Sequence, residues 1–181
     1  MKTLLIVFHS ATGGTRQMAE AAFAAATEAG ASPAGASPQE RSQGRSQGST
    51  RIRLIEAQDA EASDILAADG YLFACPENLA AMAGRMKDFF DRAYYDVVDQ
   101  VNGRPYATMI CAGSDGTNAA RQIARIATGW RLREVAEPLI VCTHAQTKEA
   151  IQARKSISNA DLDRCRELGA ALAVGIGLGV F

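Results

Sequence analysis

The fold of this chain is decided by the stretch Leu4-Leu5-Ile6-Val7-Phe8-His9-Ser10-Ala11-Thr12-Gly13-Gly14-Thr15. Its first five residues form an unbroken apolar run, which is typical of a central parallel strand covered on both faces. Its second half is rich in hydroxyl groups and glycine. Apolar and small residues then recur at helical spacing from Met18 to Ala29 and stop at Gly30. The stretch therefore predicts a strand, a tight loop and a helix in immediate succession.

The rest of the chain alternates in the same way between strand-like and helix-like segments. Strands are predicted at 51–55, 70–75, 107–112 and 139–143, and helices at about 60–68, 82–97, 118–131 and 162–172. We expect Pro76 to end the strand that precedes it. Strands that alternate with helices need parallel crossovers. The sequence thus predicts a three-layer α/β fold, a doubly wound five-stranded parallel sheet with the strand order 2-1-3-4-5.

Length and composition favour a single domain over residues 1–181, because 48% of the residues are hydrophobic and one core of this size is sufficient. Nineteen basic and twenty acidic residues give no positive field, so neither nucleic acid nor a membrane surface is an expected partner. The N-terminus lacks the pattern of a secretory signal, which predicts a cytoplasmic protein. Residues 168–181 are apolar but shorter than the roughly 20 residues of a membrane span, so we expect a buried helix there.

Two further features of composition bear on organisation and chemistry. At about 31–50, repeats of Gly-Ala-Ser-Pro and Arg-Ser-Gln-Gly predict a flexible low-complexity insertion. The four cysteines, at 75, 111, 142 and 165, are far apart and form no CxxC pair. We therefore expect free, mostly buried thiols and no metal site.

A ligand of such a sheet binds at the carboxyl ends of the strands where the strand order reverses, between the first and third strands. The loop Ser10 to Thr15 lies there, and it offers three hydroxyls and two glycines just before a helix. Glycines allow backbone N–H groups to point inward, and a helix N-terminus favours negative charge. The loop therefore predicts phosphate binding. The alternative is an ordinary turn capped by Thr15, but a cap needs only one hydroxyl.

Other phosphate-binding patterns do not match this loop. It has neither the Gly-Lys-Ser/Thr of a Walker loop nor a GxGxxG fingerprint. The spacing from Ser10 to Arg16 matches the CxxxxxR loop of small tyrosine phosphatases, but serine lacks the low pKa of the thiol nucleophile. A receiver domain would have aspartate at the end of the third strand, where this chain has Cys75. Phosphatase and phosphoacceptor functions are therefore disfavoured.

Two motifs together resemble a known family. Ser10-Ala11-Thr12-Gly13-Gly14-Thr15 is similar to the S/T-x-T-G-x-T phosphate loop of flavodoxins. The residues from Pro76-Glu77-Asn78-Leu79 to Met86-Lys87-Asp88-Phe89-Phe90-Asp91-Arg92 resemble the second flavin loop and helix of NAD(P)H-dependent FMN reductases and flavodoxin-like quinone reductases. The resemblance covers nearly the whole chain outside residues 30–50. It implies a flavodoxin-like fold and flavin mononucleotide (FMN) as the cofactor.

The resemblance also implies which residues bind FMN. They are Ser10, Thr12, Gly13, Gly14 and Thr15 at the phosphate, Pro76, Glu77, Asn78 and Leu79 beside the flavin ring, and Gly113, Ser114, Asp115 and Gly116 over its pyrimidine end. For the third group, a glycine turn that caps the helix at Asn118 is an equally simple interpretation. His9 and His144 are expected near the same end of the sheet, but no catalytic residue is assigned.

The function implied is an oxidoreductase in which NAD(P)H delivers electrons through FMN to a quinone, a flavin or a similar acceptor. The alternative is a flavodoxin-type carrier that passes single electrons to a redox partner protein without a nicotinamide site. Near-neutral charge and the absence of aromatic residues in 76–82 and 113–118 argue against a carrier. A flavin-free interaction module remains a third possibility, because fold alone does not define function. A homo-oligomer is compatible with all three.

Overall fold

The computed structural model describes residues 1–31 and 49–181 of the chain. The strands are β1 (Lys2–Phe8), β2 (Thr50–Glu56), β3 (Gly70–Asn78), β4 (Ala81–Met82), β5 (Pro105–Ala112), β6 (Arg133–Glu134) and β7 (Leu139–Cys142). The helices are α1 (Gly14–Gly30), α3 (Ala62–Ala67), α4 (Gly84–Val97), α5 (Thr117–Gly129), α6 (Lys148–Gln152) and α7 (Asn159–Leu178). All five strands predicted from the sequence are present.

The predicted order of the five main strands is confirmed. β2, β1, β3 and β5 follow one another in the sheet, β7 pairs with β5, and all of these pairs are parallel. Two short strands that the sequence did not predict enlarge the sheet to seven. β6 adds two residues beside the start of β5, and β4 is antiparallel to the end of β3. The sheet is therefore not purely parallel.

The apolar run of β1 is explained by its central position. Its consecutive residues alternate between two separate cores, with Leu5 and Val7 in one and Leu4, Ile6 and Phe8 in the other. Four of these five side chains have no exposed surface, and Phe8 retains 3%. A strand covered on both faces has no solvent side that would accept a polar residue. The run at residues 4–8 follows directly from this.

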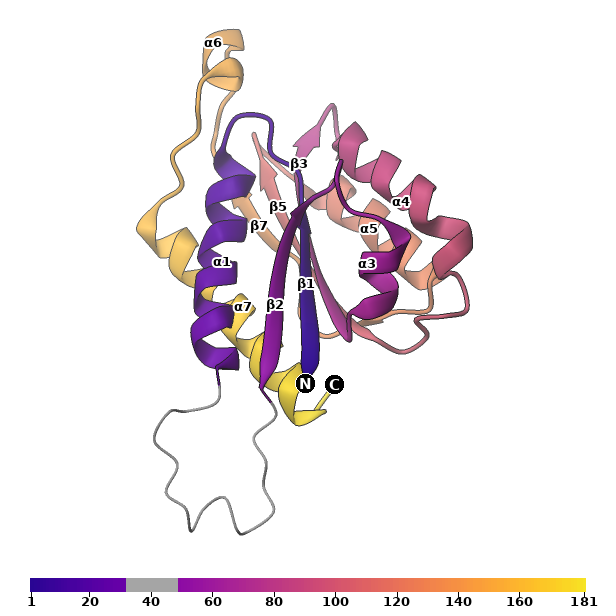
Figure 1. The fold of residues 1–181 in the computed structure, drawn as a ribbon. Coiled ribbons are helices and arrows are strands. Elements are labelled where there is room, and N and C mark those ends of the chain that lie inside the picture. Colours follow the sequence, from indigo (N-terminus) through magenta and orange to yellow (C-terminus); the bar gives the residue numbers. More distant parts are fainter. Residues whose placement is uncertain (32–48) are drawn as a thin grey trace.

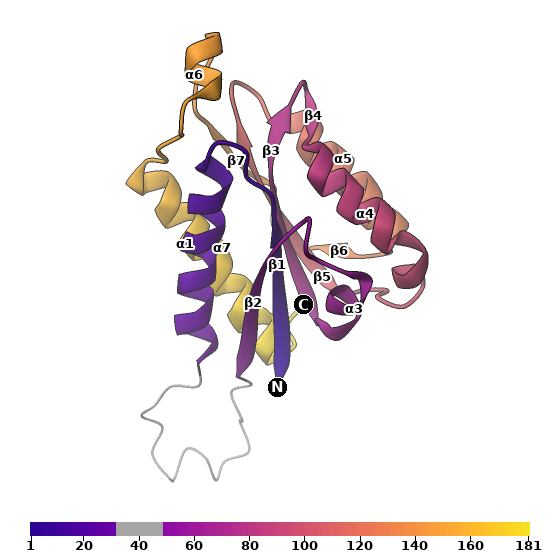
Figure 2. The ribbon, with the colours of Figure 1, turned by 45° about the horizontal axis from the view of Figure 1, so that its top comes forward.

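The helices form the two outer layers (Figure 1). α1 and α7 cover one face of the sheet, and α3, α4 and α5 cover the other, as the second view also shows (Figure 2). α1 and α7 lie so close that a Cβ atom at Gly169 would stand 2.2 Å from the Ala22 carbonyl oxygen. These layers fix α1, and with it the loop at its N-terminus, against the carboxyl end of β1.

Several boundaries differ from the prediction. α4 begins at Gly84 instead of Met82, because Met82 belongs to β4. Most of the insertion expected at about 31–50, residues 32–48, lies outside the described residues. Thr50 already belongs to β2. α7 extends to Leu178 and buries Leu172 and Ile176, in line with the expected terminal helix. In the described ranges, no helix is both long and apolar enough to cross a membrane.

Candidate functional site

The loop between β1 and α1 is built around a left-handed glycine. Gly13 has φ +87° and forms the N-cap of α1, where its N–H donates to the Ser10 hydroxyl at 3.2 Å. A Cβ atom at Gly14 would lie 2.6 Å from the Cys111 sulfur, so the backbone here approaches β5 more closely than another residue allows. The loop thus presents the first backbone N–H groups of a 17-residue helix toward the carboxyl ends of the strands.

Thr15 contains a buried polar group with no partner. Its side chain is 1% exposed, and its Oγ1 atom has no hydrogen bond to any residue that the structure describes. An unsatisfied buried hydroxyl costs about 1–3 kcal/mol. Such a group in a loop beside a cavity is suited to an acceptor supplied by a ligand.

The second loop is a β-hairpin, and this corrects the prediction that Pro76 ends β3. Pro76 pairs with Cys111 of β5 and its carbonyl accepts the Ala83 N–H at 3.1 Å. Proline lacks only the donor, so a strand can pass through it where the carbonyl alone is needed. β3 then continues to Asn78 and turns back into β4.

The two residues of this turn have unusual backbone angles. Leu79 and Ala80 have φ +51° and +57°, which is the pattern of a two-residue type I′ turn. Such a turn favours Asn-Gly, and a left-handed conformation costs other residues about 1–2 kcal/mol each. The Leu79 side chain is fully exposed. Strain of this kind is concentrated at functional sites.

Replacing Leu79-Ala80 with Asn-Gly is expected to raise the free energy of unfolding by about 1–2 kcal/mol, because both residues tolerate positive φ. Urea denaturation of the two proteins measures the difference. Leu79→Ala alone is the control, since it removes the exposed side chain and keeps a strained residue. An equal gain in the control, or no gain in the double variant, would contradict the assignment of strain to the turn.

Three hydrogen bonds hold the hairpin against α5. The Glu77 carboxylate accepts the Gly116 N–H at 2.9 Å, and the Met82 N–H donates to the Gln122 side chain at 2.9 Å. The Asn118 side chain donates to the Ala80 carbonyl at 2.5 Å. The strained turn is therefore fixed from outside by the first turns of a helix that begins 37 residues after it.

The third loop follows β5, and only its first two residues belong to the cavity. Gly113 and Ser114 reach the cavity, whereas Asp115 and Gly116 do not line it. The Asp115 carboxylate accepts the Thr117 hydroxyl at 2.6 Å, and Gly116, with φ +84°, is the N-cap of α5. The helix-capping interpretation of Asp115 and Gly116 thus agrees with the geometry, because these residues are used to begin α5 and to hold Glu77.

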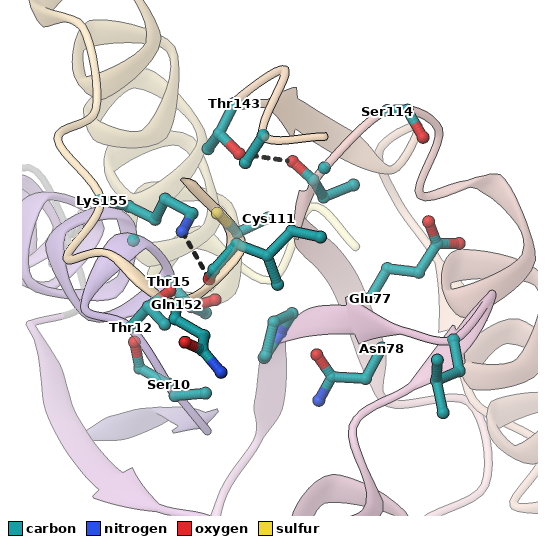
Figure 3. A pocket seen from close by; sticks show the side chains of 18 of the residues that line it. Ser10, Thr12, Thr15, Glu77, Asn78, Cys111, Ser114, Thr143, Gln152 and Lys155 are labelled. Carbon is teal, nitrogen blue, oxygen red and sulfur yellow. Dashed lines mark hydrogen bonds between the residues drawn. The ribbon is translucent and has the colours of Figure 1, made fainter. Parts of the chain in front are cut away.

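The loops enclose a cavity of about 560 Å³ at the carboxyl ends of β1, β3 and β5 (Figure 3). Of the residues expected there, it is lined by Ser10, Thr12, Gly14, Thr15, Pro76, Glu77, Asn78, Leu79, Gly113 and Ser114. Gly13 lines a second cavity of about 400 Å³ on the other side of its loop. The structure therefore brings three loops that are far apart in the sequence together around one cavity.

Other residues at the cavity were not identified from the sequence. They are Ala11, Ala80, Cys111, Ala112, Thr143, Ala145, Ile151, Gln152 and Lys155. Thr143 could have been expected, because it is the last residue of the fifth predicted strand. Residues 147–157, which we call the strap, contain α6 and carried no recognised motif. The strap projects beyond the carboxyl end of the sheet, next to the loop before α1 (Figure 1).

Titratable groups near the cavity offer little acid–base chemistry. Burial raises the pKa of the Cys111 thiol to about 11, although the charge of Lys155 and the neighbouring Thr15 side chain oppose this shift. Burial, assisted by Arg85, lowers the pKa of His9, against a raising effect of Glu56. Neither His9 nor His144 lines either of these two cavities. All four cysteines are free, as expected, and three are buried.

A parallel sheet of this order, with a phosphate-type loop after β1 and a cavity at the switch point, defines a flavodoxin-like protein. The family model described as NADPH-dependent FMN reductase matches residues 1–147. The chain therefore belongs to this family, and it is an FMN flavoprotein with a flavodoxin-like fold.

Relatives and solved structures agree with this class. A protein named flavodoxin from Aquifex aeolicus (strain VF5) is 25% identical over 186 residues, which cover 98% of this chain and 89% of the relative. The structure of a flavodoxin from the domain Archaea is similar with a TM-score of 0.69 at 16% identity, covering 96% and 98% of the two chains. Oxidised Flavodoxin 1 from Bacillus cereus gives 0.68 at 19% identity, covering 94% and 97%.

Proposed function

We propose that the protein binds FMN in the cavity between the three loops and is an oxidoreductase that takes electrons from NAD(P)H. The acceptor would be a quinone, another flavin or a similar small molecule. The observation that carries the proposal is the loop Ser10–Thr15, in which a left-handed glycine begins a long helix and a buried hydroxyl lacks an acceptor. A phosphate group would supply that acceptor.

The residues at the cavity fit both the phosphate and the flavin ring of FMN. The phosphate would be held by Ser10, Thr12, Gly13, Gly14 and Thr15 through hydroxyls and helix N–H groups. The flavin ring would lie near Pro76, Asn78 and Leu79, with Gly113 and Ser114 offering a short polar loop. Glu77 would act indirectly, because its carboxylate is bonded to Gly116. Asp115 and Gly116 would position the hairpin instead of contacting the cofactor.

The lining of the cavity supports an enzyme more than a carrier. Among the described residues that line it, none is aromatic, and the apolar side chains at its edge include Leu79 and Ile151. An open ring face leaves room for a nicotinamide at the short distance that hydride transfer needs. Bound FMN would supply the redox chemistry itself, so the proposal assigns no side chain as a catalytic acid or base.

The electron carrier is the second candidate, and the relative named flavodoxin is the observation in its favour. The two functions differ in whether the protein itself accepts electrons from a nicotinamide. A carrier would need a separate reductase, and its acceptor would be a partner protein.

The test is an anaerobic titration of the purified, FMN-loaded protein. NADPH or NADH is expected to bleach the flavin absorbance directly, and a quinone added afterwards is expected to restore it. Dithionite is the control that shows the flavin to be reducible. If dithionite bleaches the flavin and neither nicotinamide does, the carrier replaces the enzyme. A colourless protein that cannot be reconstituted with micromolar FMN would remove the proposal altogether.

A further inference from the structure

The loop Ser10–Thr15 has no charged side chain, although a phosphate monoester carries a charge of about −1.5 to −2 at neutral pH. Arg16, the next residue, does not supply the missing positive charge. Its guanidinium is paired with Glu56 and lies 3.7 Å from Glu20. Helix N–H groups alone would therefore face almost two negative charges, unless another element of the chain brings cations to the loop.

The strap, residues 147–157, is attached to this loop by specific hydrogen bonds. The Lys155 N–H donates to the Thr12 carbonyl at 2.8 Å. The Gln17 amide donates to the carbonyls of Gly13 and Lys155 at 2.9 and 2.7 Å, and its oxygen accepts the Ile157 N–H at 3.1 Å. These bonds join segments about 140 residues apart and fix which strap residues lie beside the loop.

Three strap residues line the main cavity, and Lys155 is the charged one; Ile151 and Gln152 are the others. Its ammonium donates to the carbonyls of Ala150, Ile151 and Ala153 at 2.6–2.8 Å, and it has no carboxylate partner among the residues described. A Cβ atom at Gly14 would lie 3.2 Å from the Lys155 Cβ. The Lys155 Cβ thus lies beside the start of α1, the ammonium is held by strap carbonyls, and its positive charge is not neutralised by an acid among the described residues.

Arg154 lies on the opposite side of the same loop. Its Cγ and Nε atoms would be 3.7 and 3.9 Å from a Cβ at Gly13, and it lines the second cavity together with Arg16 and Glu20. Within the described ranges, Arg154 makes no ion pair of 4.0 Å or less. Consecutive residues of the strap therefore place one cation at each of the two cavities beside the loop.

We propose that the strap is the electrostatic half of the phosphate site, with Lys155 and Arg154 providing the positive charge that the loop lacks. This proposal rests on the proposed FMN site. It makes these two residues the determinants of selectivity for FMN over riboflavin, which has the same ring and no phosphate. Lys155 contributes more, because it lines the cavity, whereas the exposed Arg154 is screened by solvent.

The test compares the affinities of the apoprotein for FMN and riboflavin, measured by quenching of flavin fluorescence. Lys155→Met is expected to weaken FMN binding about tenfold, in line with the loss of about 1.4 kcal/mol near a charged group. Arg154→Met should weaken it about threefold. Riboflavin binding should change less than twofold in both. Lys148→Met, which removes the same charge from a strap residue that lines neither cavity, is the matched control.

Five outcomes are decisive. A loss of FMN affinity without a loss of riboflavin affinity, absent from Lys148→Met, supports the proposal. Equal losses for both flavins would show that Lys155 only maintains the fold of the strap. An equal FMN loss in Lys148→Met would show a general charge effect. Both of these results, equal losses for the two flavins and an equal loss in Lys148→Met, would overturn the proposal. If the unmodified protein prefers FMN and no variant reduces that preference, this inference alone fails. If the unmodified protein does not bind FMN, the proposed function fails with it.

Discussion

Replacing Thr15 with valine is expected to weaken FMN binding while making the FMN-free protein more stable. The Thr15 hydroxyl is buried without a partner, so its removal relieves a desolvation cost and should stabilise the apoprotein by about 1 kcal/mol. If the hydroxyl bonds the FMN phosphate, its loss costs about 1.5–3 kcal/mol of binding free energy, or roughly 10- to 150-fold in affinity. Two effects of opposite sign are thus expected from one methyl-for-hydroxyl exchange.

Thermal unfolding of the apoprotein and titration with FMN measure the two effects separately. Thr108→Val is the matched control. Thr108 Oγ1 is also buried without a partner in the described structure, but Thr108 lies within β5 and does not line the cavity. It should show the gain in stability and no change in FMN affinity. Unchanged FMN affinity in Thr15→Val would mean that this hydroxyl takes no part in phosphate binding.

Replacing Phe73 with alanine is expected to lower the free energy of unfolding by about 3–5 kcal/mol. Phe73 is fully buried at the centre of an aromatic cluster, with ring centroids 5.8 Å from Tyr71 and 5.1 Å from Phe90. It also contacts the ring of Trp130 at 6.5 Å. A cavity here removes packing from β3, α4 and the end of α5 together. The loss is a large part of the 5–15 kcal/mol typical of a domain.

Denaturation in urea measures this loss. Tyr95→Ala is the control, because that aromatic side chain is 86% exposed and its removal should cost less than about 0.5 kcal/mol. Since β3 ends in the hairpin at the cavity, FMN affinity of the Phe73 variant should also fall near its unfolding midpoint. A loss below about 1 kcal/mol would show that the aromatic cluster is not the main core of this face.

The sequence by itself determined the order of the five main strands and the character of the first loop. An apolar run such as residues 4–8 is typical of a strand buried on both faces, and hydroxyls and glycines before a helix favour an anion site. These signals are local, because each depends on residues within a few positions of one another. From these local signals followed the α/β fold and the edge position of β2. They also predicted where the loops at Ser10, Pro76 and Gly113 lie.

Only the tertiary structure decided how the loops are held and which residues complete the site. Pro76 continues β3 because its carbonyl finds a partner at Ala83, and the Glu77 carboxylate, at the cavity, is held by the Gly116 N–H. The strap contributes Lys155 because Gln17 binds its backbone from α1. These hydrogen bonds join residues 7 to 138 positions apart. Sequence patterns report neighbours in the chain, whereas the partners of polar groups are set by where the sheet places them.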